Sequence, residues 1–191
     1  MAYRRKLPDT ASIANSLGDK RLFAPSAERN CEPIINLTKR IAPKSGKALE
    51  IASGTGQHIV NLALSLPYLS WSPSEVEEER LESISAWIEG ENLQNIKPPL
   101  YLDATETGWA KSLAQSDFIL LVNLLHLISR DETEILIIEI SKALKTNGIA
   151  LIYGPFMREG QLTSEGDKIF HYSLVQNDLE IGYKNDLDML R

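Results

Sequence analysis

The sequence predicts an α/β fold in which a mostly parallel sheet carries helices on both faces. Two observations lead to this prediction. Short apolar runs alternate along the chain with stretches of helical periodicity, as in successive β-α-β units. The apolar runs are also continuous rather than strictly alternating, which is typical of parallel strands that are buried on both faces. Connections of this length favour a doubly wound arrangement.

The individual elements follow from local signals in chain order. Ser26, beside Pro25, is expected to cap the first helix, and Pro43 is expected to end it. The last 34 residues contain a helix candidate at 165–176 and a second near Asn185, but no strand pair. The other expected strands span 47–53, 69–75, 98–103, 117–128 and 149–157, and the other expected helices span 56–67, 76–92, 109–115 and 130–148.

Length and composition limit the domain organisation. The 191 residues suit one domain with a full core. Residues 1–24 carry little periodicity and are expected to be a flexible N-terminal arm, whereas residues 25–191 are expected to form the folded domain. The formal charge of −6 argues against general nucleic-acid binding, which requires cations to neutralise phosphates. The sequence leaves the oligomeric state open.

The cysteine count and the lengths of the apolar runs indicate the compartment in which the protein is expected. Cys31 is the single cysteine, so no disulfide can form within the chain, and we interpret it as buried or incidental. No cysteine and histidine cluster has the spacing of a zinc site, so no metal is expected. No apolar run is long enough to cross a bilayer, and MAYRRKLPDT at the start lacks the apolar segment of a signal peptide. A cytoplasmic protein without a membrane partner is expected.

The stretch EIASGTGQH (50–58) is a candidate ligand loop. It lies between the first expected strand and the following helix, where parallel sheets bind ligands. Gly54 and Gly56 lack a Cβ, so the backbone can turn sharply and approach a ligand closely. The loop alone is equally typical of a tight turn without a ligand. His58, in the helix that follows, is expected to orient the loop.

Two carboxylates strengthen the ligand interpretation. Glu75 lies 21 residues after Gly54, at the end of the second expected strand, where a carboxylate accepts hydrogen bonds from ribose hydroxyls. Asp103 ends the third expected strand, where a polar side chain can contact an adenine edge. Three strand ends then converge on a site for one nucleoside.

The loop also discriminates between cofactors. A dinucleotide-binding loop has the pattern G-x-G-x-x-G, but the third position is Ile59 here. The chain also lacks the G-x-x-x-x-G-K-[ST] pattern of nucleoside triphosphate sites. A nucleoside without a pyrophosphate fits better, which favours S-adenosylmethionine over a nicotinamide cofactor.

Several motifs carry a family resemblance. LEIASGTGQH (49–58) resembles the first motif of class I S-adenosylmethionine-dependent methyltransferases. The chain as a whole is similar to the DUF938 family, also called methyltransferase-like 26. The matching stretches cover most of residues 22 to 185 in the same order; besides the glycine loop they are LFAPSAERNCEPI (22–34), LPYLSWSPSE (66–75), LDAT (102–105), NLLHLI (123–128) and YGPFMREGQLTSEG (153–166).

The resemblance implies a seven-stranded, Rossmann-like methyltransferase sheet with bound S-adenosylmethionine. Glu75 would bind the ribose, and Asp103 and Ala104 would flank the adenine. Asn123 would lie beneath the sulfonium. The residues implied at the methionine end of the cofactor are Glu50, Ser53, Gly54, Thr55 and Gly56.

Two departures from the family pattern leave two functions open. Ala52 replaces a glycine that is common in the wider class. Family members continue into two antiparallel strands, whereas this chain stops at Arg191, so the resemblance implies a sheet without its last two strands and with an exposed fifth strand. One hypothesis is a methyltransferase with an unknown acceptor. The alternative is a non-catalytic protein, a truncated form that binds S-adenosylmethionine or has a regulatory role.

Methyl transfer needs positioning more than a nucleophile, because the cofactor is already activated. His126 and Tyr153 are the catalytic candidates, with His126 either a base or a structural histidine. Phe156 either contacts the acceptor, together with Tyr153, or belongs to the core. The resemblance makes Arg29 and Asn30 candidate acceptor contacts, although they can also serve as surface residues at the start of a helix.

Overall fold

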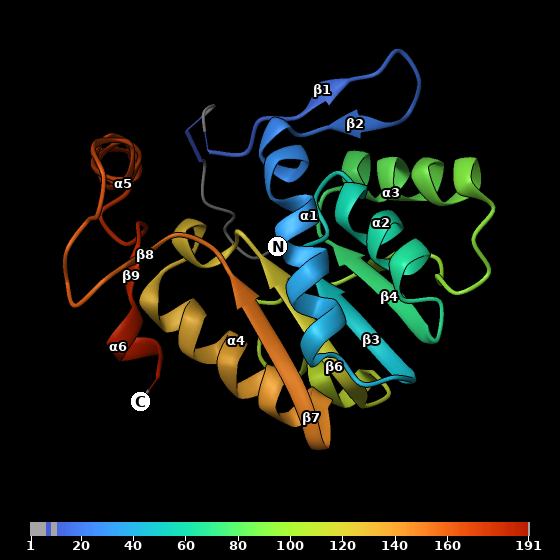
Figure 1. Cartoon of the computed structure of the whole chain (residues 1–191). Coiled ribbons are helices and arrows are strands. Elements are labelled where there is room, and N and C mark those ends of the chain that lie inside the picture. The colour runs from blue at the N-terminus through green and yellow to red at the C-terminus, as the bar shows by residue number, and fades with distance from the viewer. Residues whose placement is uncertain (1–6, 9–10, 191) are drawn as a thin grey trace.

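The computed structural model describes residues 7–8 and 11–190. Its centre is a sheet of five parallel strands in the order β5–β4–β3–β6–β7, shown in Figure 1. The strand order reverses beside β3, which places the ligand-binding crevice of such sheets at the carboxyl ends of β3 and its neighbours. The strands are β3 (Gly46–Ile51), β4 (Leu69–Glu75), β5 (Leu100–Tyr101), β6 (Ser116–Val122) and β7 (Leu144–Tyr153).

Helices cover both faces of this sheet (Figure 1). One face packs against α1 (Pro25–Ile41), α2 (Gln57–Ser65) and α3 (Glu78–Glu91). The other face packs against α4 (Arg130–Ala143) and the short helix η1 (Trp109–Ser112). The predicted α/β, Rossmann-like fold is therefore confirmed, and the five strands agree with the prediction of a seven-stranded sheet that lacks its last two strands.

The side chains of β6 show why its sequence is almost entirely apolar. Phe118, Leu120 and Val122 belong to the core on the side of α1 to α3. Ile119 and Leu121 belong to the core on the side of α4. Both faces of the strand are buried, so every position is selected for an apolar side chain and no alternation results.

Smaller elements surround the sheet. In the N-terminal region, β1 (Asn15–Ser16) and β2 (Leu22–Phe23) form an antiparallel pair. This hairpin is attached to α3, because the Leu22 amide donates to Ser83 Oγ at 2.8 Å and Trp87 Nε1 donates to the Leu22 carbonyl at 3.0 Å. The C-terminal region contains β8 (Phe156–Met157), α5 (Glu165–Asn177), β9 (Lys184–Asn185) and α6 (Asp186–Met189). A short helix, η2 (Leu125–Leu127), follows β6.

Several local predictions need correction. Ala24 is the N-cap of α1, so Ser26 lies inside the first turn rather than capping it. The helix predicted over 130–148 ends at Ala143, because the chain becomes extended at Leu144 and Asn147 adopts a left-handed conformation (φ 66°). The strand predicted over 117–128 ends at Val122 and is followed by η2.

The two ends of the chain also differ from the local predictions. The last 34 residues do contribute a strand, since β9 pairs in parallel with β8. The described part of the predicted arm at 1–24 contains the β1–β2 hairpin, whereas residues 1–6 and 9–10 lie outside the described part. β7 lies at the end of the strand order and pairs only with β6 among the described residues. None of the described helices is both long and apolar enough to cross a membrane.

Candidate nucleoside-binding site

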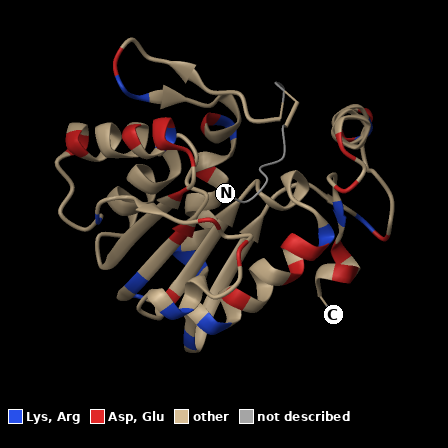
Figure 2. Ribbon diagram, turned by 180° about the vertical axis from the view of Figure 1, so that it is seen from behind, with Lys and Arg blue, Asp and Glu red and all other residues tan. Residues whose placement is uncertain are grey.

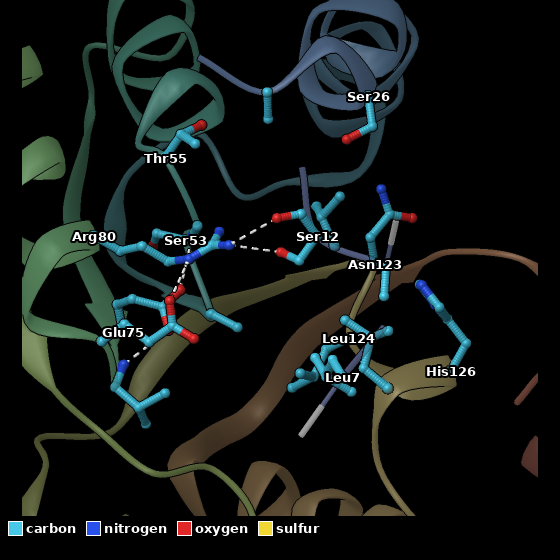
Figure 3. A pocket seen from close by; sticks show the side chains of 18 of the residues that line it. Leu7, Ser12, Ser26, Ser53, Thr55, Glu75, Arg80, Asn123, Leu124 and His126 are labelled. Atoms are coloured by element: carbon cyan, nitrogen blue, oxygen red, sulfur yellow. Dashed lines mark hydrogen bonds and ion pairs between the residues drawn. The ribbon is translucent and has the colours of Figure 1, made fainter. Parts of the chain in front are cut away.

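A cavity of about 730 Å³ lies at the carboxyl ends of β3, β4 and β6 (Figure 3). Its walls come from the glycine loop after β3, the end of β4, the segment after β5 and the end of β6. The first turn of α1, residues of the N-terminal region, Glu132 of α4, Pro155 and Phe170 also line it. The site therefore occupies the crevice at which the strand order reverses.

The glycine loop holds three residues in left-handed conformations, namely Ala52 (φ 53°), Gly54 (φ 59°) and Gly56 (φ 95°). Ala52, Ser53, Gly54 and Thr55 line the cavity, but Gly56 does not. Gly56 instead packs on α3, where an added Cβ would lie 3.0 Å from the backbone of Ile84. The absence of a Cβ at Gly56 thus permits α2 to pack closely on α3. Because Gly56 does not line the cavity, the structure does not bring it to the position predicted for a cofactor contact.

Glu75 projects from the end of β4 beside the loop, as Figure 3 shows. Its Oε2 accepts a hydrogen bond from the Gly54 amide at 2.9 Å, and its Oε1 accepts one from the Val76 amide at 2.8 Å. These bonds fix the carboxylate while leaving each oxygen a lone pair for a further donor. Burial raises the pKa of Glu75, and the backbone donors oppose that increase.

The segment after β5 forms the predicted adenine end of the site. Asp103 Oδ1 accepts hydrogen bonds from the Thr105 amide at 2.9 Å and from Thr105 Oγ1 at 2.6 Å. Ala104 is buried, and its carbonyl accepts a hydrogen bond from Trp109 Nε1 at 3.2 Å. Asp103, Ala104 and Leu102 all line the cavity, which therefore offers a fixed carboxylate next to apolar surface.

Glu50 lies in β3, directly before the loop, and is 1% exposed. It does not line the cavity, in contrast to the role that the resemblance implies. Its Oε2 has no hydrogen-bond partner among the described residues, and burial raises the pKa of the carboxyl group to about 8. The Glu50 carboxyl group is therefore protonated and neutral at pH 7, in the core next to the loop.

Glu50→Gln is expected to stabilise the protein at high pH only. The folded-state pKa exceeds the ordinary value of 4.5, so the cost of burying Glu50 is absent below about pH 4.5 and grows as the pH rises towards 8. At about 1.4 kcal/mol per pH unit, the upper limit of this cost is about 5 kcal/mol, and we expect about 2 kcal/mol or more at pH 8. Urea unfolding at pH 5 and pH 8 measures the difference. A stabilisation that is equal at both pH values would contradict this account.

The end of β6 forms the wall on the predicted acceptor side. Asn123 lines the cavity and has a left-handed backbone conformation (φ 56°). Its backbone N–H donates a hydrogen bond to the Tyr153 carbonyl at 2.8 Å. His126 also lines the cavity and lies beside Asn123 in Figure 3. Tyr153 and Phe156 do not line it, because their side chains pack against the two core clusters. Of the two catalytic candidates, the structure brings only His126 to the site.

His126 is 4% exposed and neutral at physiological pH, because burial and the charge of Lys184 lower its pKa to about 4. Its Nδ1 has no hydrogen-bond partner among the described residues. The ring contacts Phe170 and Tyr183 edge-on, with centroids 5.5 and 6.2 Å apart. As a neutral imidazole at the cavity wall, His126 is a candidate proton acceptor for a bound molecule, and its Nδ1 atom is itself buried.

The two substrate candidates in α1 differ in position. Arg29 is exposed and lines the cavity. Asn30 does not line it and instead contacts His58 Nε2 at 2.8 Å. Arg29 therefore remains a candidate contact for the acceptor, whereas Asn30 can act only through other residues.

One wall of the cavity, formed by N-terminal residues, was not predicted from the sequence. Leu7 and residues 11–13 line it, and Arg80 of α3 connects to them. Arg80 Nη2 donates to Ser12 Oγ at 2.6 Å and to the Ser12 carbonyl at 3.3 Å, while its Nε donates to Glu77 at 2.8 Å (Figure 3). Ser12 and Arg80 are 68 positions apart, and no local sequence pattern predicts a contact over that separation.

Comparison with known proteins identifies the class of fold and then the family. The strand order and the position of the cavity define the Rossmann-like fold of class I methyltransferases. The chain belongs to the family of proteins of unknown function DUF938, whose model matches residues 21–190.

Solved structures support the fold. An O-methyltransferase family protein from Burkholderia thailandensis superposes with a TM-score of 0.72 at 14% identity, covering 86% of this chain and 49% of that one. Human N-acetylserotonin methyltransferase, in complex with S-adenosylmethionine, gives 0.69 at 12% identity, with 86% and 44% coverage. Mitomycin 7-O-methyltransferase gives 0.69 at 15% identity, with 86% and 46% coverage. This chain spans about half the length of these structures.

Proposed function

We propose that this protein is an S-adenosylmethionine-dependent methyltransferase that acts on a small-molecule acceptor. The observation that carries the proposal is the cavity itself. Glu75 and Asp103, at the ends of neighbouring strands, line it together with the glycine loop, and His126 lines its other side. The site thus combines a place for one nucleoside with a neutral proton acceptor. The methyltransferases of similar fold include a complex with S-adenosylmethionine, which supports this cofactor.

The charges around the cavity fit the proposed cofactor. S-adenosylmethionine carries a sulfonium and an ammonium group, which a wall rich in carboxylates attracts. The same wall disfavours the pyrophosphate of a dinucleotide and the backbone of a nucleic acid. Figure 2 shows acidic residues along α3 and α4. Basic residues gather near the end of the sheet that lies opposite the carboxyl ends of the strands. Among the described residues, the charged groups that line the cavity are Glu75, Glu77, Asp103, Glu106, Glu132, Arg29 and Arg80.

The residues of this chain bind and orient the reactants. When bound, S-adenosylmethionine supplies a methyl group already activated for displacement. Glu75 holds the ribose and Asp103 the adenine. The His126 imidazole takes the proton that a hydroxyl or amine acceptor loses, and Phe170 forms an apolar part of the wall. We further propose that the protein works in the cytoplasm and needs no membrane or nucleic acid.

Isothermal titration calorimetry with S-adenosylmethionine, S-adenosylhomocysteine and NAD tests the proposal. We expect both adenosyl ligands to bind and NAD not to bind. Failure of both adenosyl ligands to bind would overturn the proposal. Binding of S-adenosylmethionine without methyl transfer to any of a broad set of hydroxyl and amine acceptors would instead favour the non-catalytic alternative.

A further inference from the structure

Three polar side chains form a chain of hydrogen bonds at the cavity, and we call them the amide relay: Asn123 after β6, Asn30 in α1 and His58 in α2. Asn123 and His58 line the cavity, and Asn30 does not. Asn123 Nδ2 donates to Asn30 Oδ1 at 3.1 Å, and Asn30 Nδ2 donates to His58 Nε2 at 2.8 Å. The amide relay connects a cavity residue to two helices on one face of the sheet. None of its contacts is used in the proposed binding of the adenosine.

The orientation of the Asn30 amide follows from its neighbours. Its nitrogen also faces the carbonyl oxygens of Ser26 and Ala27, at 2.8 and 3.0 Å. The opposite orientation would place the amide oxygen against these two carbonyls, so complementarity assigns the direction of every bond. His58 agrees with this assignment. Burial lowers its pKa to about 4, so the ring is neutral and Nε2 can accept a hydrogen bond.

The same bonds determine how Asn123 presents its amide to the cavity. The nitrogen is held by Asn30, so the oxygen must point away from α1. Asn123 Oδ1 forms no hydrogen bond with any described residue, although the side chain lines the cavity. In Figure 3 the amide oxygen points to the side on which His126 lies. A fixed carbonyl dipole is therefore available at the wall next to the proposed proton acceptor.

We propose that Asn30 and His58 are positioning residues that fix the rotation of the Asn123 amide, so that its oxygen faces the transferred methyl group and the incoming acceptor. The inference rests on the proposed function, because it needs a cofactor in the cavity. Asn30 lies outside the cavity wall, and His58, which lines it, has its Nε2 atom engaged by Asn30. Without them, the Asn123 amide can turn and present its nitrogen instead, which repels a positively charged group.

The arrangement also defines the acceptor. A fixed carbonyl oxygen requires a donor, so the acceptor atom carries an N–H or O–H group when it binds. An amine acceptor with two N–H groups donates one to Asn123 Oδ1 and passes the other proton to the His126 imidazole during transfer, whereas the single proton of a hydroxyl acceptor moves from Asn123 Oδ1 to His126. A thioether or another nucleophile without a proton would leave the carbonyl oxygen without a partner, at a cost in affinity.

Binding of two cofactor analogues tests the inference without an acceptor. S-adenosylhomocysteine has no group at the methyl position, whereas sinefungin places a protonated amine there. Calorimetry measures the ratio of the dissociation constants of S-adenosylhomocysteine and sinefungin. We expect Asn123→Ala to lower this ratio by about tenfold, because a charge-assisted hydrogen bond is lost. Asn30→Ala and His58→Phe are expected to lower it by roughly threefold or more, since each frees the amide.

Two matched variants control for general effects on the same helices. Asn36→Ala changes an exposed residue of α1. Asn61→Ala removes the hydrogen bond that the Asn61 side chain donates to the Gln57 carbonyl in α2. Both are expected to keep the wild-type ratio. An unchanged ratio in Asn30→Ala and His58→Phe, or an equal loss of affinity for both analogues, would overturn the inference while leaving the proposed function intact. Failure of the wild-type protein to bind either analogue would overturn the proposed function itself.

Discussion

His126→Phe is expected to slow methyl transfer by at least about 100-fold while leaving the dissociation constant of S-adenosylhomocysteine almost unchanged. Phenylalanine keeps the ring contacts with Phe170 and Tyr183 but removes both nitrogens of the imidazole. The acceptor then keeps its proton as its nucleophilic atom attacks, which raises the barrier. Release of S-adenosylhomocysteine with an active hydroxyl or amine acceptor measures the rate.

The pH profile adds an independent check on His126. Its pKa of about 4 means that the imidazole stays neutral above about pH 5, so protonation of His126 should not reduce the wild-type rate between pH 8 and pH 5. His171→Phe is a matched control, because His171 lies outside the cavity wall and accepts a hydrogen bond from the Tyr183 amide at 3.1 Å. A His126→Phe rate within threefold of wild type would show that His126 is only structural.

Glu75→Ala is expected to raise the dissociation constant of S-adenosylhomocysteine by about 100-fold. Two hydrogen bonds from ribose hydroxyls to a buried carboxylate account for an effect of this size, at about 1.5 kcal/mol or more each. The substitution also leaves the Gly54 and Val76 amides without their acceptor, which loosens the loop. Calorimetry measures the affinity, and thermal unfolding without ligand shows how much the fold itself suffers.

Two variants make the Glu75 result specific. Glu75→Gln keeps the shape and one acceptor oxygen, so a smaller loss of about tenfold is expected. Glu77→Ala removes another carboxylate from the cavity wall, but one that already pairs with Arg80, and it should change the affinity little. If Glu75→Ala binds as tightly as wild type, Glu75 does not hold the ribose.

The fold was predictable because each parallel strand and each crossover helix leaves a local pattern. β3 and β6 follow from apolar runs, and β4, on the other side of β3, follows from a short segment that ends in Glu75. Glu75 and Asp103 could be assigned to one site because the carboxyl ends of parallel strands meet at one edge of a sheet. The boundary between α4 and β7 was not predictable, since Leu144 continues the helical pattern while the backbone is already extended.

The remainder of the site depends on where side chains point and on contacts between residues that are far apart in the sequence. Glu50 and Gly56 belong to the right segment, but the Glu50 side chain is buried in the core and Gly56 packs against α3, so neither lines the cavity. Tyr153 ends a strand just as Val122 does, and only packing decides that it joins the core. The bond between Arg80 and Ser12 and the amide relay join segments far apart in the chain, and no local pattern records them.

A crystal structure with bound S-adenosylhomocysteine tests the central claim most directly. The account predicts the ligand in the cavity at the carboxyl ends of β3, β4 and β6, with the ribose hydroxyls within hydrogen-bond distance of Glu75 and the adenine beside Asp103. The homocysteine sulfur should lie between the glycine loop and Asn123. A ligand bound elsewhere, or an adenosine in the opposite direction with its base towards His126, would contradict it.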